Sequence, residues 1–193
     1  MSYRLVLAST SPFRRQILEK LGLIFETASP DIDESRFDNE PPEKLVERLA
    51  LQKAQAVAEE YSDALIIGSD QVACLNEQIL GKPGDYNNAV KQLQESSGNT
   101  VIFLTGLCLL NTSTGKHQLI HDPFKVHFKQ LESSEIDGYL QKEKPYNCAG
   151  SFKSEALGIA LFEKLEGDDP NSLMGLPLIR LIAMLNREGL RVI

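Results

Sequence analysis

The stretch Leu5–Arg15, LVLASTSPFRR, determines how the chain begins to fold. Its first four residues form an unbroken apolar run, which is typical of a strand covered on both faces. Ser11 and Pro12 then combine an N-cap residue with proline at the first helical position, so the pattern predicts a helix directly after the strand. The first turn of such a helix has unpaired N–H groups and the positive end of the helix dipole.

Polar side chains gather around this predicted helix start. Ser9 and Ser11 contribute hydroxyl groups, and Arg14 and Arg15 contribute guanidinium groups. Together with the free N–H groups they favour an anion site, with phosphate as the first ligand to consider. A capped surface helix with two solvated arginines is the alternative, and the stretch alone favours phosphate only slightly.

Length and composition limit the class of protein. A chain of 193 residues is long enough for one compact domain with a substantial core. Its net charge of -7 argues against a general nucleic-acid binder, which needs a basic face. The three cysteines, Cys74, Cys108 and Cys148, form no C-x-x-C pair, so neither a disulfide framework nor a zinc site is predicted. Without an apolar run of about 18 residues or a signal-peptide pattern, a soluble cytoplasmic protein without a membrane partner is expected.

Strands and helices alternate along the first half of the chain. The patterns predict strands at 24–27 and 64–67, an apolar hairpin at 76–77, and helices at 42–61 and 85–97. From residue 100 onwards, two β-rich segments joined by a turn predict a long antiparallel pair, followed by a short helix capped by Ser133 and a last helix from about 178. We therefore expect one mixed α/β sheet in a single domain spanning residues 1–193.

Asp70 is the strongest single candidate for chemistry. It follows Gly68 just beyond a predicted buried strand, where open α/β sheets place their ligands. A carboxylate there can hold a divalent metal or take a proton from water, although a turn aspartate is an equally good interpretation. Glu34, near Asp31 and Asp33, is a candidate second metal ligand, but a solvated acidic loop is the favoured interpretation.

Two lysines and three histidines also need interpretation. Lys53 falls in line with the apolar stripe of the 42–61 helix, so it either reaches the helix edge or faces a polar cleft. Lys82 lies in a Gly-Lys-Pro segment, but the full phosphate-loop pattern is absent, which excludes a P-loop NTPase. His117, His121 and His127 share strand parity, which favours a half-exposed strand face over a metal site. The motifs of hydrolase triads, zincins and Rossmann dehydrogenases are also absent.

Several short segments follow one another in a set order along the chain: Ser9–Arg15, Asp33-Glu34, 50–54, Gly68-Ser69-Asp70, Gly81-Lys82-Pro83, Thr105-Gly106, Ala149-Gly150-Ser151 and Gly175–Leu178. Their ordered combination resembles the Maf family of nucleoside triphosphate pyrophosphatases over essentially the full length. The resemblance implies an elongated mixed sheet with two lobes around a central cleft, similar to the inosine triphosphatase fold. It also implies a divalent metal, Mg²⁺ or Mn²⁺, a homodimer, and cleavage between the α and β phosphates.

The resemblance also implies roles for the candidate residues. Asp70 activates the attacking water or binds the metal, and Glu34 is a metal ligand. The residues expected to bind the triphosphate are Ser9, Ser11, Arg14, Arg15, Lys53 and Lys82.

Two departures from the usual family pattern narrow the expected substrate. Phe13 stands between Pro12 and Arg14, and the segment Gly150–Glu155 replaces a glutamine-containing one. Both resemble the YceF-type branch, which acts on 7-methyl-GTP. Methylation makes the guanine cationic, and a cation is favoured by an aromatic face and by a carboxylate. The resemblance therefore implies that Phe13, Gln71 and Glu155 select the base.

Plainer interpretations remain open for the three base-selecting residues. Phe13 lies one helical step before Ile17 and suits a core position, Glu155 suits a surface loop, and Gln71 suits an exposed turn. The alternative functions are a dTTP/UTP pyrophosphatase of the same family and a non-catalytic nucleotide-binding protein linked to cell division. Retention of the full charged set, including Asp70, favours an enzyme.

Overall fold

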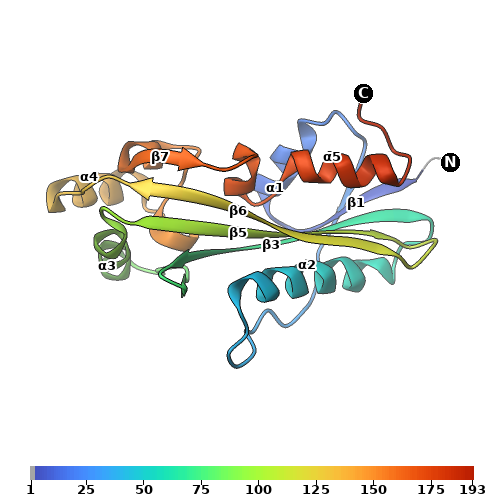
Figure 1. The fold of residues 1–193 in the computed structure, drawn as a ribbon, viewed down its shortest axis with the longest axis horizontal. Helices are drawn as coiled ribbons and strands as arrows, with labels where there is room; N and C mark the ends of the chain where they lie inside the picture. The colour runs from blue at the N-terminus through green and yellow to red at the C-terminus, as the bar shows by residue number, and fades with distance from the viewer. Residues whose placement is uncertain (1–2) are drawn as a thin grey trace. The chain divides into compact units, whose positions relative to one another are not determined.

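The computed structural model describes residues 3–193. Its strands form one seven-stranded sheet in the order β2-β1-β3-β5-β6-β7, with β4 paired to β3 (Figure 1). β1 is parallel to β2 and β3, whereas the β3–β4 and β6–β7 pairs are antiparallel, so the predicted mixed sheet is confirmed. The strands are β1 Arg4–Ala8, β2 Glu26–Ala28, β3 Ala64–Leu75, β4 Gln78–Leu80, β5 Thr100–Asn111, β6 His117–Phe128 and β7 Phe162–Glu166. The helices are α1 Pro12–Glu19, α2 Pro42–Ala58, α3 Tyr86–Ser96, α4 Ser133–Glu143 and α5 Leu178–Arg187, with shorter 3-10 turns η1 Ala149–Ser151, η2 Leu157–Leu161 and η3 Pro170–Met174.

The chain forms two compact units. Unit 1 comprises residues 1–71, 105–122 and 169–193, and unit 2 comprises residues 72–104 and 123–168. The strands β3, β5 and β6 each contribute residues to both units. That the whole chain behaves as one domain stays a prediction.

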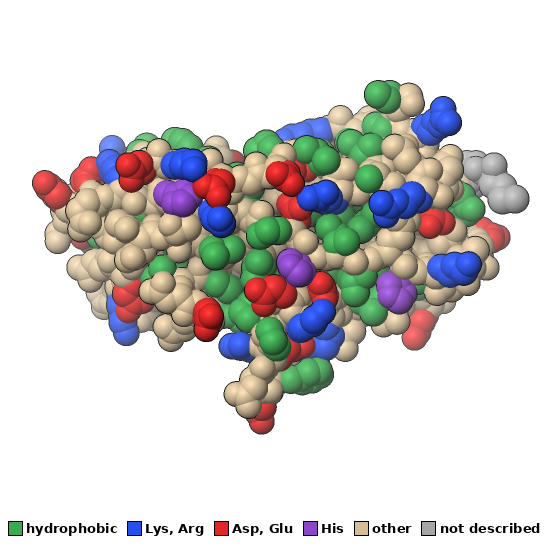
Figure 2. All heavy atoms as spheres, in the orientation of Figure 1, with side chains coloured by type: hydrophobic (Ala, Val, Ile, Leu, Met, Phe, Trp, Pro, Cys, Tyr) green, Lys and Arg blue, Asp and Glu red, His purple; other side chains and the backbone are tan. Residues whose placement is uncertain are grey.

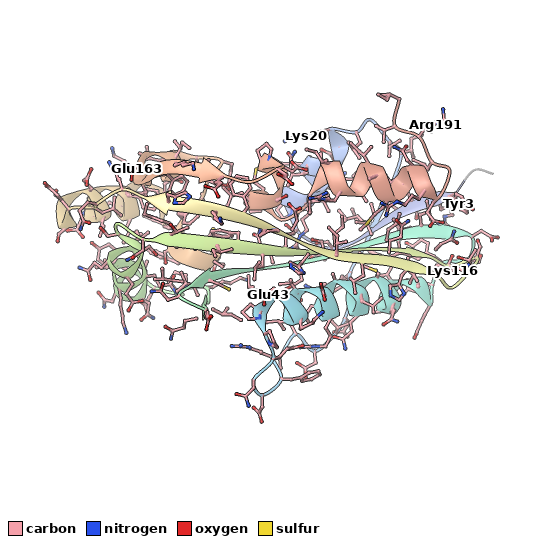
Figure 3. The ribbon with its side chains drawn as sticks, viewed as in Figure 1. Tyr3, Lys20, Glu43, Lys116, Glu163 and Arg191 are labelled. Carbon is pink, nitrogen blue, oxygen red and sulfur yellow. The ribbon has the colours of Figure 1, made fainter. Side chains whose placement is uncertain are left out.

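In unit 1, helices cover both faces of the sheet, and the strands alternate between two cores. Figure 1 shows α2 on one face and α1 with α5 on the other, and Figure 3 labels Glu43 at the start of α2 and Lys20 just after α1 on these opposite sides. The core under α1 and α5 contains Leu5, Leu7, Leu65, Ile67, Leu107 and Leu109. The core under α2 contains Val6, Ala8, Ala64, Ile66, Cys108 and Leu110.

Two glycines allow α2 to lie directly on the sheet. A Cβ atom at Gly68 in β3 would overlap the backbone carbonyl of Ala50, and one at Gly106 in β5 would overlap that of Val46. A glycine is required wherever a helix backbone approaches a strand this closely. This close packing fixes the height of Lys53, further along α2, above the neighbouring strand β3.

Unit 2 has an aromatic core. The rings of Phe103, Phe128, Phe152 and Phe162 pack edge to face, with centroid separations of 4.9–5.5 Å. Phe152 is 5% exposed, so the segment 150–155 enters the core at this residue. Edge-to-face pairs of this kind stabilise a core beyond the area that they bury.

Several sequence predictions need correction. The second strand begins at Glu26 and not at 24, and Ile24 is 97% exposed. Strand β3 does not end near Gly68 but continues to Leu75, so Asp70 lies within a strand. Helix α2 ends at Ala58, and the N-cap of α4 is Glu132 rather than Ser133. The predicted hairpin at 76–77 and the helix capped by Asp85 are confirmed.

The surface carries charges of both signs. On the face drawn in Figure 2, Lys and Arg side chains lie among Asp and Glu side chains rather than in one continuous patch. Across residues 3–193, no helix is both long and apolar enough to span a membrane.

Candidate active site

The start of α1 has the predicted cap. The Ser11 side chain accepts a hydrogen bond from the Arg14 N–H at 3.4 Å, and Pro12 is the first helical residue. The Ser9 hydroxyl oxygen accepts from the Ser11 N–H at 3.1 Å. Strand β1 ends at Ala8, which is paired with Gly68, so these hydroxyls lie where β1 stops and β3 continues.

Arg14 is anchored by the C-terminal part of the chain. Its Nε donates to the Gly175 carbonyl at 2.9 Å, and the Ser69 hydroxyl donates to the same oxygen at 2.9 Å. Gly175 has φ of +94°, and a Cβ there would contact the Arg14 guanidinium, so glycine suits this position on both counts. Burial lowers the pKa of Arg14, while the negative charges of Asp70 and Glu34 oppose that shift. The guanidinium therefore lies within electrostatic range of two carboxylates.

Lys53 joins those two carboxylates. Its Nζ lies 2.6 Å from Asp70 Oδ1 and 2.7 Å from Glu34 Oε1. Lys53 and Asp70 are 6% and 8% exposed, whereas the Glu34 side chain is 59% exposed. Lys53 therefore does not snorkel to the helix edge, and its ammonium group lies among polar side chains. Its role in binding the substrate stays a prediction.

The side chains of β3 divide between its two faces at this point. Asp70 lies on the α2 face with Lys53, while Ser69 and Gln71 lie on the opposite face. The Gln71 amide nitrogen donates to the Thr105 hydroxyl at 2.8 Å and to the Ser172 carbonyl at 2.7 Å. Gln71 is therefore half-buried within a strand, and the exposed-turn interpretation is wrong.

The remaining four predicted residues, Phe13, Arg15, Lys82 and Glu155, are exposed. The Arg15 side chain is 62% exposed and forms an ion pair with Glu19, one turn further along α1. Phe13 is 42% exposed, so the core interpretation of this residue is wrong. Lys82 and Glu155 are both exposed and belong to unit 2.

The histidines follow the predicted strand face. His117 and His121 are exposed on β6, and His127 is half-buried. His121 Nδ1 lies 2.7 Å from Glu47 Oε1.

Glu34 and Asp70 suit a divalent cation. Both carboxylates already contact one cationic group, the Lys53 ammonium. Among residues 3–193, no cluster of three or more His, Cys, Asp or Glu side chains could hold a metal, so this pair would supply only part of a coordination shell. Mg²⁺ is commonly bound in this way, by one or two carboxylates together with substrate phosphates and water.

Sequence reasoning missed three contributors to this arrangement: Ser69, the Gly175 carbonyl and Arg48. Ser69 appears next to Asp70 in the sequence, but only the continuation of β3 shows that its hydroxyl turns to the other face. The Gly175 carbonyl is a backbone group with no sequence signal. Arg48 binds the loop that carries Glu34 through contacts that depend on tertiary structure.

Comparisons with known proteins identify the family and support the fold. The family model described as Maf-like protein matches residues 4–188. A protein of Colwellia psychrerythraea named 7-methyl-GTP pyrophosphatase is 58% identical over 189 residues, covering 98% of this chain and 94% of that protein. Proteins with the same name in Alcanivorax borkumensis and Pseudoalteromonas translucida are 58% and 55% identical, covering 97% and 100% of this chain and 95% and 96% of their own lengths. The Staphylococcus aureus Ham1 protein structure has a TM-score of 0.53 at 14% identity, covering 96% of this chain and 99% of its own, which supports the likeness of fold.

Proposed function

This chain belongs to the Maf family, and from that premise we propose that it is a pyrophosphatase that hydrolyses 7-methyl-GTP to 7-methyl-GMP and pyrophosphate. The observation that carries the proposal is the Glu34–Lys53–Asp70 group next to the anchored Arg14. The near full-length relatives named 7-methyl-GTP pyrophosphatase support the choice of substrate.

The chemistry needs charge neutralisation and an activated water rather than a covalent intermediate. Asp70, which accepts a hydrogen bond from Lys53, is suited to accept a proton from the attacking water. Arg14 neutralises phosphate oxygens, since its Nε is committed to Gly175 and its Nη groups have no hydrogen-bond partner among residues 3–193. A divalent cation, Mg²⁺ or Mn²⁺, bound by Glu34 and Asp70 would supply further charge neutralisation.

The remaining phosphate contacts belong to the same proposal. Ser9 and Ser11 offer hydroxyls at the start of α1, and Lys82 offers an ammonium group. Arg15 would have to leave Glu19 to bind the nucleotide, so it is the weakest member of the set.

Base choice is assigned to three residues. Phe13 has an exposed ring that can stack on the cationic 7-methylguanine, and Glu155 is an exposed carboxylate that can accept from the guanine N1–H and amino group. The Gln71 amide nitrogen is committed to Thr105 and Ser172, so its contribution would come through its Oε1 atom.

The test is pyrophosphate release from a panel of 7-methyl-GTP, GTP, dTTP and UTP with Mg²⁺ or Mn²⁺. We expect 7-methyl-GTP to be the best substrate. The Phe13→Ala, Glu155→Ala double variant should lose more kcat/KM on 7-methyl-GTP than on GTP. Loss of one stacking or cation–π contact should lower kcat/KM for 7-methyl-GTP by roughly five- to thirtyfold. Preference for dTTP and UTP, or binding without turnover, would instead support one of the two alternative functions.

Two further properties remain predictions that the family resemblance supports. We expect a homodimer, which light scattering coupled to size-exclusion chromatography would detect. We also expect a cytoplasmic location, which fractionation of cells expressing the tagged protein would test.

A further inference from the structure

Arg48 binds the loop that carries Glu34. It lies on α2, and its side chain is 17% exposed. Its Nε and Nη2 donate to the two oxygens of Glu40 at 2.7 and 2.8 Å, and its Nη1 donates to Gln52 Oε1 at 3.0 Å. The contact between Arg48 and Glu40 is therefore a bidentate arginine–carboxylate pair, which fixes the relative orientation of the two side chains.

The same guanidinium holds the beginning of the loop. Its Nη2 also donates to the Ser35 carbonyl at 2.9 Å, and the Phe37 ring covers it with its centroid 3.9 Å from Cζ. The Phe37 N–H donates to Glu40 Oε2 at 3.2 Å. Residues 35 to 40 are therefore attached to a single side chain at both ends.

Glu34 is placed at the edge of this attached segment. It directly precedes Ser35, whose carbonyl Arg48 binds, and its exposed side chain reaches Lys53 at 2.7 Å. Without such an anchor, a mostly exposed glutamate on a loop samples many conformations, because fixing it in one of them costs conformational entropy. The charge pairing is mutual: hydrogen bonding to Glu40 raises the pKa of Arg48, and hydrogen bonding to Arg48 lowers that of Glu40.

We propose that Arg48 is a positioning residue that holds Glu34 beside Lys53 and Asp70 through the loop 35–40. The inference rests on the proposed function, in which Glu34 acts on the nucleotide or its metal. It assigns a role to a side chain that touches none of the reacting groups. Lysine cannot replace it, because an ammonium group lacks the planar set of donors that reaches Glu40 and Ser35 together.

The first test is hydrogen–deuterium exchange of the nucleotide-free protein. Arg48→Lys keeps the positive charge but loses the bidentate guanidinium contacts. Amides of residues 34–40 should therefore exchange faster, while the exchange rates of amides in β1 and β3 should not change. Lys44→Ala is the matched control, because it removes an exposed ion pair with Glu47 on the same helix. Unchanged exchange in the loop of Arg48→Lys would overturn the proposal.

The second test is a double-mutant cycle with Glu34→Gln. In the wild-type background Arg48→Lys should lower kcat/KM for 7-methyl-GTP, by up to about 10²-fold for a misplaced reacting group. In the Glu34→Gln background the same change should cost nothing further. Equal losses in both backgrounds would show that Arg48 does not act through Glu34. A wild-type protein that does not hydrolyse 7-methyl-GTP would overturn the proposed function alone, since the exchange experiment needs no substrate.

Discussion

Lys53 and Asp70 form an almost fully buried ion pair, and each compensates for the burial of the other's charge. Glu34 completes the group from the solvent side. The Lys53 ammonium group thus contacts two carboxylates, and a carboxylate can take a proton or bind a cation. At the scale of single residues, this group is the most specific chemical feature of unit 1.

Asp70→Asn should nearly abolish turnover while leaving the fold intact. Asparagine has the same size and can still accept the hydrogen bond from Lys53, but it cannot take a proton. Loss of a general base typically lowers the rate by about 10² to 10⁴. Pyrophosphate release from 7-methyl-GTP measures the effect, and circular dichroism checks the fold. Asp63→Asn is a matched control at an exposed position with φ of +52°, which asparagine tolerates; turnover by Asp70→Asn at the control's rate would contradict the role.

At the scale of elements, the sequence predicted helices better than it predicted the end of β3. The apolar stripe of α2 and the cap of α1 are local patterns, and both were found as predicted. The polar residues Ser69 to Gln71 interrupt the apolar run of β3, so the strand was expected to stop before them, whereas pairing elsewhere in the sheet carries it on to Leu75. This continuation places Asp70 and Gln71 on opposite faces, which no local pattern indicates.

Gly106→Ala should destabilise the protein and lower its activity together. The new methyl group would overlap the Val46 carbonyl, and a helix backbone cannot move aside cheaply. Overpacking of this kind costs about 1–3 kcal/mol, and a shift of α2 would move Lys53 away from Asp70. Urea denaturation and 7-methyl-GTP hydrolysis measure the two effects. Gly138→Ala in α4 is the control: apart from its chain neighbours and the backbone of α4 itself, no described atom lies within 4 Å of a Cβ placed there, so this change should be neutral or stabilising.

The attachment of the loop 35–40 should depend on pH through Glu40. Hydrogen bonding from Arg48 lowers the pKa of Glu40 below its ordinary value near 4.5, and the charges of Arg48 and Arg36 act in the same direction. The ionised form is therefore favoured in the folded loop. The ionised Glu40 carboxylate stabilises the folded loop fully when the pH is above the ordinary glutamate pKa. This stabilisation is lost as the pH falls through the lowered pKa of Glu40 in the folded protein.

The Phe37 amide is a direct reporter of this titration, because it donates to Glu40 Oε2. Its chemical shift should stay constant from neutral pH to about 5 and change only in more acidic solution. Glu40→Gln should remove this change in the Phe37 amide shift. It should leave the separate titration of Asp33 unchanged, since the pKa of Asp33 is lowered by hydrogen bonds from Ser35. A midpoint at or above the ordinary glutamate value would contradict the assignment.

At the scale of the whole molecule, the family resemblance implied two lobes in a chain without a linker, but no local pattern marked where one compact unit ends along the chain and the other begins. The boundary falls inside strands: residues 64–71 of β3 belong to unit 1 and residues 72–75 to unit 2. Strand patterns run through that boundary without a change of composition, so nothing local marks it. Lys82 and Glu155 were accordingly grouped with residues such as Lys53 from their order in the family pattern and not from any property of their surroundings.

We expect the two units to unfold as one. Domains that unfold independently are usually joined by exposed linkers, whereas here β3, β5 and β6 each contribute residues to both units. Loss of either unit would leave three truncated strands with unpaired backbone groups, which is costly in a buried sheet. Calorimetry should therefore show a single transition whose van't Hoff and calorimetric enthalpies agree.

Hydrogen exchange along β5 is a second test, because residues 101–104 belong to unit 2 and residues 107–110 to unit 1. Amides of both segments should exchange through the same global opening, with equal free energies of opening. Two transitions, or two distinct opening free energies along that one strand, would mean that the units are separate domains.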